Sequence, residues 1–353
     1  MKKKGVSLTK FFLLIGSFVA ALFITDTVIA QSQPFYQGKT ERIVVGFTPG
    51  GFYDRWARLL ARYLPKYIPG NPEFIVQNMP GASSVIAANY VYNVASPDGL
   101  TLGMSINSLY LDQLVGRKEA KYDVRKYEWI GSQEKTFTTL YFRADSPYKT
   151  IDDVVKSKEP PKCGSTGTAS TSFILPKVLE ETLGAKFSIV LGYPGGSEID
   201  LAVQKGEVVC RGQDINSHSG REPFLTWHKT GFDRHLMQDG PKHDPRVPDA
   251  PTLGEIMDRY STPAESRKVA EIILSTGELG RPLMATPGTP ADRVKVLRDA
   301  YARALSGPSL IDEAKRGRMD MEPTPGEVIQ KLMNEVIDQP ADIIARVKKV
   351  LSN

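Results

Sequence analysis

The sequence predicts an α/β protein of two lobes, each a mostly parallel sheet flanked by helices. Three observations lead to this prediction. Strand-like and helix-like stretches alternate along the chain. Glycine-containing turns stand between a strand and a helix at four places. The chain has 353 residues, enough for two domains at ~100–200 residues each.

The N-terminal thirty residues have the pattern of a secretory signal peptide. Four lysines within the first ten residues precede an apolar run from Phe11 to Ile24, and small residues lead to a cleavage point near Ala30/Gln31. A membrane anchor is the competing interpretation, but the run is shorter than the ~20 residues that a spanning helix needs. We therefore expect export and a mature chain of about residues 31–353.

Charge and cysteine content narrow the class of partner. Lys and Arg are scattered among Asp and Glu without a basic stripe, so we expect no nucleic-acid partner. Cys163 and Cys210 each lie in a strand-like stretch of a chain predicted to reach an oxidising compartment. A disulfide and two buried free thiols both remain open, while a CxxC metal or redox pattern is absent from the sequence.

The first strand–helix junction lies in residues 41–64. The apolar stretch from Ile43 to Phe47 ends at Thr48-Pro49-Gly50-Gly51, and a helix with apolar residues at helical spacing follows. Three further stretches repeat the arrangement. Residues 73–95 contain Pro80-Gly81, residues 162–184 contain a Gly- and hydroxyl-rich turn, and residues 187–207 contain Pro194-Gly195-Gly196.

These junctions predict a ligand site. Each would place a helix N-terminus, with unpaired N–H groups and a positive dipole end, beyond the carboxyl end of a strand. Two early and two later junctions suggest two lobes that face one cleft. Such a cleft would suit an anion without needing any arginine.

The remaining chain completes the two lobes. Residues 128–155 predict a strand followed by a helix from about Thr150, and we place the first crossover near Thr138 to Arg143. We expect lobe 1 to comprise 31–138 and 283–353, and lobe 2 to comprise 139–282. One C-terminal helix is predicted over 325–351, packed across the first lobe.

Several short motifs occur in one order along the chain. They are Pro49-Gly50-Gly51-Phe52-Tyr53-Asp54, Asn78-Met79-Pro80-Gly81-Ala82, Pro97-Asp98-Gly99-Leu100-Thr101-Leu102, Asp145 to Asp153, Tyr193-Pro194-Gly195-Gly196 and Pro287-Gly288-Thr289-Pro290. In this order they resemble the solute-binding receptors of the tripartite tricarboxylate transporter family, the Bug receptors, over nearly the whole mature chain.

The resemblance implies a periplasmic, two-lobed binding protein of the second (Venus-flytrap) type. It implies a monomer without cofactor or metal, binding a small organic carboxylate, aromatic or dicarboxylate among the options, and delivering it to integral-membrane permease subunits. Carried over by motif, the ligand-binding candidates are Thr48, Gly50, Gly51, Phe52, Tyr53, Asp54, Ala82, Ser83, Ser165, Thr166, Thr168, Ser170, Gly195, Gly196 and Asp214.

Three of these candidates have two interpretations. Phe52 and Tyr53 stand where the family has small residues, so they could stack on an aromatic acid, narrow the pocket or pack on the lobe surface. Asp54 could cap its helix alone or also contact the ligand through water. A carboxylate at that position would otherwise repel an anion.

Other chemistries find weaker support in the sequence. The run Ser165-Thr166-Gly167-Thr168 lacks the Lys and the spacing of a nucleotide loop. The spacing of His218, His228, His235 and His243 does not place them on one helical face, which favours surface residues over a loop-borne metal site. No G-x-S-x-G elbow is present. We expect a receptor and no enzyme; a secreted enzyme acting on an acid or ester and a sensor for a membrane kinase are the alternatives.

Overall fold

The structure is a computed structural model that describes Met1 and residues 33–352. The chain divides into two units, Met1–Pro34 and Phe35–Asn353, and the second unit holds every element described below. The predicted signal peptide and its cleavage point lie outside the described residues. Within the described part of the chain, helices long and apolar enough to cross a membrane are absent.

The first sheet has six strands in the order β11-β4-β10-β3-β1-β2. Its strands are β1 (Thr40–Val45), β2 (Glu73–Asn78), β3 (Thr101–Met104), β4 (Glu128–Ser132), β10 (Pro282–Ala285) and β11 (Thr324–Pro325). β1 pairs in parallel with β2 and β3, whereas β10 runs antiparallel to β3 and β4 and β11 runs antiparallel to β4.

The second sheet has five strands in the order β7-β6-β8-β5-β9. Its strands are β5 (Thr138–Arg143), β6 (Lys162–Gly164), β7 (Ser188–Val190), β8 (Cys210–Asp214) and β9 (Asp233–Gln238). β6 pairs in parallel with β7 and β8, and β5 runs antiparallel to β8 and β9.

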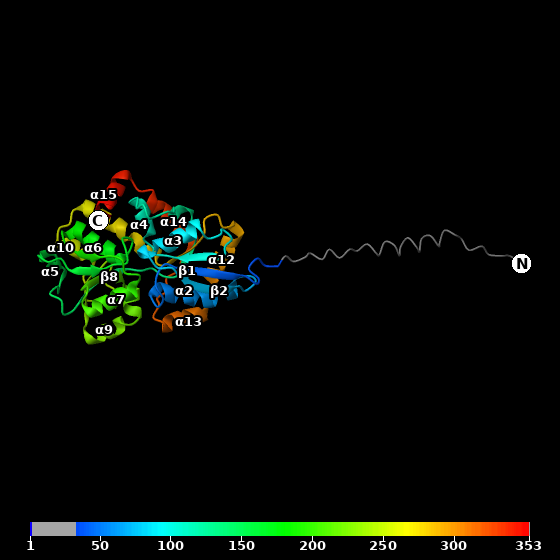
Figure 1. The fold of residues 1–353 in the computed structure, drawn as a ribbon, viewed down its shortest axis with the longest axis horizontal. Coiled ribbons are helices and arrows are strands. Elements are labelled where there is room, and N and C mark those ends of the chain that lie inside the picture. The colour runs from blue at the N-terminus through cyan, green and yellow to red at the C-terminus, as the bar shows by residue number, and fades with distance from the viewer. Residues whose placement is uncertain (2–32, 353) are drawn as a thin grey trace. The chain divides into compact units, whose positions relative to one another are not determined.

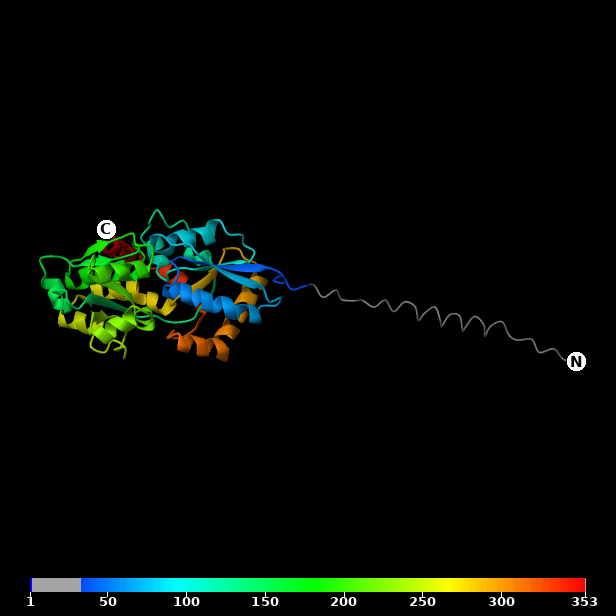
Figure 2. The ribbon, with the colours of Figure 1, turned by 60° about the horizontal axis from the view of Figure 1, so that its bottom comes forward.

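The predicted α/β class, with two sheets flanked by helices, is confirmed (Figure 1, Figure 2). The parallel share of each sheet is smaller than expected. The reason is that β5 and β10, the strands by which the chain enters one sheet after leaving the other, run antiparallel to their neighbours.

Helices pack against these strands, α2, α3, α12 and α14 on the first sheet and α6 and α7 on the second. They are α2 (Phe52–Tyr63), α3 (Val85–Asn93), α4 (Leu109–Leu114), α5 (Ile151–Lys156), α6 (Thr171–Leu183), α7 (Gly196–Lys205), α8 (Ile215–Gly220), α9 (Phe224–Thr230), α10 (Leu253–Arg259), α11 (Ala264–Leu274), α12 (Ala291–Leu305), α13 (Pro308–Arg316), α14 (Gly326–Ile337) and α15 (Ala341–Leu351). Short 3₁₀ turns are η2 (Leu64–Tyr67), η3 (Ala82–Ser84), η4 (Val124–Lys126) and η5 (Ser275–Leu279).

Local sequence explains where these helices form. In α2 the side chains of Phe52, Trp56, Leu59 and Leu60 are buried, which is the spacing of one helical face. α5 begins at the predicted position, because Thr150 and Asp153 form a capping box that satisfies two otherwise unpaired N–H groups.

The C-terminal segment corrects one prediction. The single helix expected over 325–351 is two helices, because Pro340 has no N–H to donate and disfavours a helical residue before it. α14 packs on β4 of the first sheet, as expected, but α15 packs on α6 and α11. The expectation that the whole segment lies across the first lobe is therefore wrong for α15.

A disulfide joins Cys163 of β6 to Cys210 of β8, which lie opposite each other on paired strands. Both side chains are fully buried. The bond links residues 47 apart in sequence, a separation for which the loss of unfolded-chain entropy stabilises by on the order of 4 kcal/mol. Of the two alternatives that the sequence leaves open, the structure has the disulfide.

Candidate functional site

A small cavity of ≈ 80 Å³ lies where segments that follow strands of the two sheets meet. Eight of the residues predicted to bind ligand line it. They are Thr48, Gly51, Phe52, Tyr53, Thr166, Ser170, Gly196 and Asp214.

Three of the four predicted helix N-termini begin at this cavity. Gly51 precedes α2, Ser170 precedes α6, and Gly196 opens α7. Helix N-termini carry N–H groups without intrahelical partners, so they favour an anion. The fourth junction, at Ala82 to Ser84, does not line the cavity.

The other predicted residues lie behind or beside the cavity. Ala82 and Thr168 line a separate hollow, and the Ser83 hydroxyl lies 2.7 Å from that of Thr166. Ser165 and Ser170 exchange a hydroxyl–hydroxyl hydrogen bond of 2.6 Å. The remaining three residues are Gly50, Asp54 and Gly195. Their contacts, described next, are with other loop and helix residues of the protein.

Asp54 is a buried structural residue. Its Oδ2 accepts hydrogen bonds from the N–H of Gly50 and from Arg58, both at 2.9 Å, and its Oδ1 accepts one from Asn78 at 2.9 Å. Burial alone would raise the pKa of Asp54, but these hydrogen bonds outweigh it and the pKa is lowered. The carboxylate therefore fixes the Gly50 turn and does not line the cavity.

The loops from the two sheets touch above the cavity. Thr48 donates to Glu198 at 3.1 Å, and Ser108 donates to the carbonyl of Ala169. Gly195 lies so close to Thr48 that a Cβ added to Gly195 would lie 2.1 Å from the Thr48 hydroxyl oxygen. Glycine is required there because the two loops approach each other.

Three arginines that sequence reasoning missed line the cavity: Arg211 on β8, Arg221 after α8, and Arg281 before β10. The sequence reasoning expected a cleft that suits an anion without needing arginine, and the cavity contains three arginines in addition to the helix N-termini. The sequence held one signal for these arginines, because the charged Arg211 directly follows Cys210 at a buried strand position. Which strand ends converge was not readable from the sequence.

The arginines are held by carboxylates. Arg211 and Arg221 both form ion pairs with Asp200, and Arg281 pairs with Glu134 and, at 2.6 Å, with Asp214. Burial lowers the pKa of Arg281 to about 10, so this side chain is still charged at neutral pH. Burial also raises the pKa of Asp214, an effect that hydrogen bonds from Ser217 oppose.

These ion pairs leave some N–H donors of the three arginines unused. The Nε atoms of Arg211, Arg221 and Arg281 are buried without a hydrogen-bond partner among the described residues. A buried donor left unpaired costs ~1–3 kcal/mol, which a ligand acceptor would recover. The site thus combines buried cationic donors with helix N-termini.

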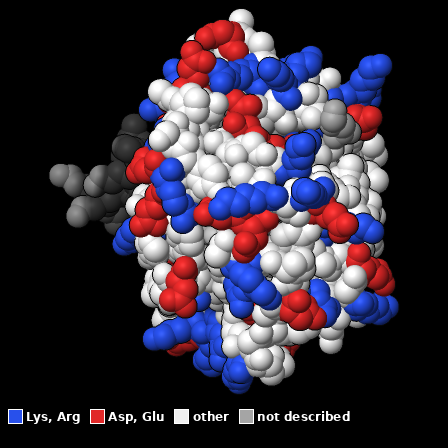
Figure 3. Space-filling model, turned by 90° about the vertical axis from the view of Figure 1, so that its left-hand side faces the viewer, with Lys and Arg blue, Asp and Glu red and all other residues white. Residues whose placement is uncertain are grey.

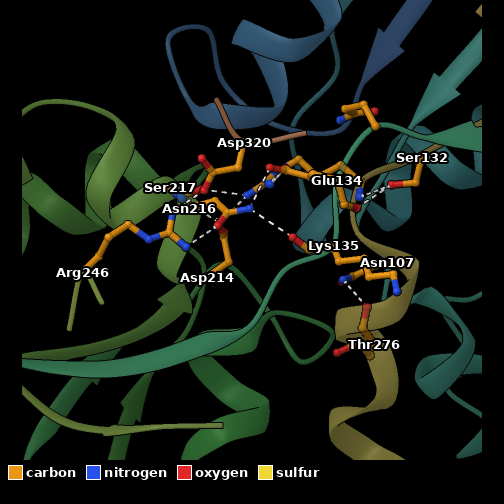
Figure 4. Close-up of polar contacts among 12 residues, drawn as sticks. Asn107, Ser132, Glu134, Lys135, Asp214, Asn216, Ser217, Arg246, Thr276 and Asp320 are labelled. Atoms are coloured by element: carbon orange, nitrogen blue, oxygen red, sulfur yellow. Dashed lines mark hydrogen bonds and ion pairs between the residues drawn. The ribbon is translucent and has the colours of Figure 1, made fainter. Parts of the chain in front are cut away.

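Figure 4 shows polar contacts that join the two sheets, among them those of Glu134, Asn216 and Ser217. Ser217 lies 2.8 Å from Arg281, and Asn216 donates to Glu134 at 2.9 Å and to the carbonyl of Lys135 at 3.0 Å. Segments next to β4 and β10 thereby meet α8 of the second sheet.

Phe52 and Tyr53 pack on a cation and line the cavity. The Arg281 guanidinium carbon lies 4.6 Å from the Phe52 ring centre and 4.9 Å from that of Tyr53. Such contacts contribute ~2 kcal/mol when desolvated. Phe52 is only 4% exposed, so packing on the lobe surface is wrong for it.

Two of the four histidines, His218 and His235, depart from the expectation of surface residues. His218 is fully buried, and its imidazole lies against those of His228 and His235, with ring centres 4.8 and 4.6 Å away. His235 is half-buried, whereas His228 and His243 are exposed, as expected for surface residues. On the face at the α5 and α10 end, Figure 3 shows positive and negative side chains interspersed.

Comparison with known proteins supplies the family. The profile described as "Tripartite tricarboxylate transporter family receptor" matches residues 57–349. A UPF0065 protein of Agrobacterium vitis is 28% identical over 52% of this chain, a match that covers 56% of that relative, or about half its length. A UPF0065 protein of Pseudomonas sp. is 24% identical over 84% of this chain and 83% of its own.

Solved structures of similar fold have low sequence identity. The periplasmic binding protein BugD has a TM-score of 0.70 at 19% identity, covering 89% of this chain and 98% of its own. MatC from Rhodopseudomonas palustris, solved with bound malate, has 0.68 at 21% identity, covering 89% and 99%. Another R. palustris protein, solved with adipate, has 0.67 at 20% identity, covering 88% and 97%. Because the profile matches most of the sequence, this chain belongs to the tripartite tricarboxylate transporter family of solute-binding receptors.

Proposed function

We propose that this protein captures a small organic carboxylate in the cavity between its two sheets and delivers it for uptake. The observation that carries the proposal is the set of three buried arginine Nε donors beside three helix N-termini. Charge-assisted hydrogen bonds contribute ~1.5–3 kcal/mol each, so three or four of them, less closure costs, are compatible with micromolar binding.

The proposed mechanism is closure of two lobes, 31–138 plus 283–353 and 139–282, over the ligand, with α15 at the end of the first range packed on α6 and α11 of the second lobe. The contacts between Thr48 and Glu198 and between Ser83 and Thr166 would then belong to the closed state. The cavity of ≈ 80 Å³ favours a small acid. Malate and adipate, the ligands of two structural relatives, are the first candidates for a test.

Residue roles follow from position. In this proposal the carboxylate contacts the turn at Gly51, the N-terminus of α6 at Ser170 and the three arginines. Phe52 and Tyr53 form the wall that holds Arg281. Family membership motivates two further parts of the proposal, a periplasmic location after cleavage near Ala30/Gln31 and integral-membrane permease subunits as partners.

The test is a thermal-shift and calorimetric screen of mono-, di- and tricarboxylates, aromatic acids, sugars and amines. We expect at least one carboxylate to raise the melting temperature and to be recovered unchanged. Shifts for sugars or amines alone, or consumption of the acid, would overturn the proposal.

Gly51→Val locates the site. A Cβ at Gly51 would meet only the Thr48 carbonyl at 3.6 Å, so the fold should tolerate the change while the side chain fills cavity space. We expect affinity for the carboxylate to fall more than ~100-fold, about 2.7 kcal/mol. Gly254→Val is the matched control, because its added Cβ would also meet a single atom, at 3.8 Å, away from the cavity. Equal affinities of Gly51→Val and wild type would remove this turn from the site.

A further inference from the structure

Four side chains outside the carboxylate cavity converge on one point. His218 comes from α8, His228 from α9, and Asp233 and His235 from β9. One ligand-type atom from each lies within 4.8 Å of all the others. Asp233 and His235 are two residues apart on a strand, so they share a face of the sheet.

We propose that His218, His228, Asp233 and His235 form a binding site for a divalent transition metal, with zinc as the best fit. Three imidazoles and one carboxylate are ligands that Zn²⁺ takes in tetrahedral sites. This inference does not depend on the proposed carboxylate function.

The distances suit a four-coordinate ion. The His218 Nε2 lies 2.8 Å from Asp233 Oδ2 and 2.6 Å from His235 Nε2, while His228 Nδ1 lies 3.4 Å from Asp233 Oδ1. Tetrahedral zinc, with ligand atoms ~2.0–2.2 Å away, needs them about 3.3 Å apart. Small side-chain rotations would therefore be enough to move the closest pair, His218 Nε2 and His235 Nε2, to that separation around an ion.

The cluster is unsatisfied without an ion. Asp233 Oδ1 is buried, in a side chain that is only 1% exposed, and the His228 Nδ1 that lies 3.4 Å away makes no hydrogen bond with it. The Nε2 atoms of His218 and His235 lie 2.6 Å apart, and their lone pairs repel each other if neither nitrogen carries a proton. A cation placed between these atoms would satisfy the carboxylate oxygen and both nitrogens at once.

Gln213 lies on the other side of the His218 ring from the cluster. The His218 Nδ1 lies 2.6 Å from the amide nitrogen of Gln213, and the amide oxygen, Oε1, is buried without a partner among the described residues, which favours exchanging the two amide positions. With that oxygen turned toward the ring, Nδ1–H donates and Nε2 keeps its lone pair for the metal.

Access to the cluster is available. A hollow of ≈ 530 Å³ is lined by His228, Asp233 and His235, which gives an ion a route from solvent. Four protein ligands leave no open coordination position, so the site is structural: the ion would tie α8, α9 and β9 together.

The experiment uses the untagged protein, stripped with a chelator and gel-filtered. We expect one Zn²⁺ per chain by calorimetry and elemental analysis, a rise in melting temperature, and a visible absorption band of tetrahedral Co²⁺ when cobalt is the probe. The cobalt spectrum of the wild-type protein does not depend on whether any variant folds.

Two histidine variants complete the test. His228→Gln removes the most exposed ligand of the cluster and should weaken Zn²⁺ binding by more than ~100-fold. His243→Gln is the matched control, because His243 contacts Pro248 and Glu255 outside the cluster, and it should bind as wild type does. Substoichiometric metal with no tetrahedral cobalt band, or equal affinity of His228→Gln and wild type, would overturn the proposal.

Discussion

The two Pro-Gly junctions of the first sheet have similar sequences and different uses. Pro49-Gly50-Gly51 follows β1 and opens α2 at the cavity. Pro80-Gly81 follows the neighbouring strand β2, but the next three residues form η3, in which Ser83 and Ser84 are buried. The comparison teaches that a helix-start motif predicts a helix N-terminus without predicting what that terminus faces.

The second junction is held by its own side chains. Ala82, Ser83 and Ser84 have φ values of +46°, +51° and +71°, a region that costs non-glycine residues ~1 kcal/mol or more each. Contacts offset this cost: the Ser84 hydroxyl accepts from the N–H of Ile106, and Ser83 bonds to Thr166. The first junction has glycine instead, with φ of +83° at Gly50, and needs no such support.

The largest effect is expected at the packing of the second junction. A Cβ at Gly46 would lie 2.0 Å from Ser84 Cβ and 2.8 Å from its Cα, so Gly46→Ala must displace backbone. We expect a loss of ~3 kcal/mol in the free energy of unfolding, measured by urea denaturation. Gly254→Ala should change it by less than ~1 kcal/mol. Equal midpoints for the two variants would contradict this close packing.

Asp54 tests how the first junction is held. Asp54→Ala removes the acceptor for Gly50, Arg58 and Asn78, and we expect a loss of ~2 kcal/mol at pH 7 with ligand affinity within about twofold. Because the pKa of Asp54 is lowered in the folded state, its contribution is present above the unfolded pKa and is lost as pH falls through the folded one.

The stability difference between wild type and Asp54→Ala should therefore shrink below about pH 4, as measured by thermal unfolding across pH. Asp54→Asn, which keeps the shape without the charge, should fall between them. A large loss of ligand affinity in either variant would place Asp54 in contact with the ligand.

Gly195→Ala tests the contact between the first junction and α7. The added Cβ would collide with the Thr48 hydroxyl, so the loops cannot close fully. We expect ligand affinity to fall ~10-fold, about 1.4 kcal/mol, with the unfolding free energy of the ligand-free protein nearly unchanged. In a Thr48→Ala background the hydroxyl is absent, so Gly195→Ala should lower ligand affinity less than it does in the wild-type protein. Additive effects of the two changes would contradict the collision.

The smallest effect is expected from Ser83→Ala. It removes one hydrogen bond to Thr166, so we expect a loss of ~1 kcal/mol or less in stability and a few-fold change in affinity by calorimetry. An affinity loss above tenfold would mean that Ser83 contacts the ligand, and the two junctions would then be equivalent.

Local chemistry made part of this protein predictable from the sequence. The apolar spacing of α2 and the capping box at Thr150 depend on residues within one or two helical turns, so the sequence alone shows both patterns. The alternation of strands and helices identified the α/β class for the same reason. Pro340, which separates α14 from α15, is a further local signal in the sequence.

The site required the tertiary structure. Arg211 lies on β8 of the second sheet, whereas Arg281 directly precedes β10 of the first, and His218, His228 and His235 come from three elements. Their convergence depends on strand order and on how the chain crosses between sheets. By itself the sequence determined which segments become helices and strands and where helix N-termini stand. Only the fold decided which of those termini face the cavity and which charges meet there, because such contacts join residues far apart in the chain and leave no periodic signal within it.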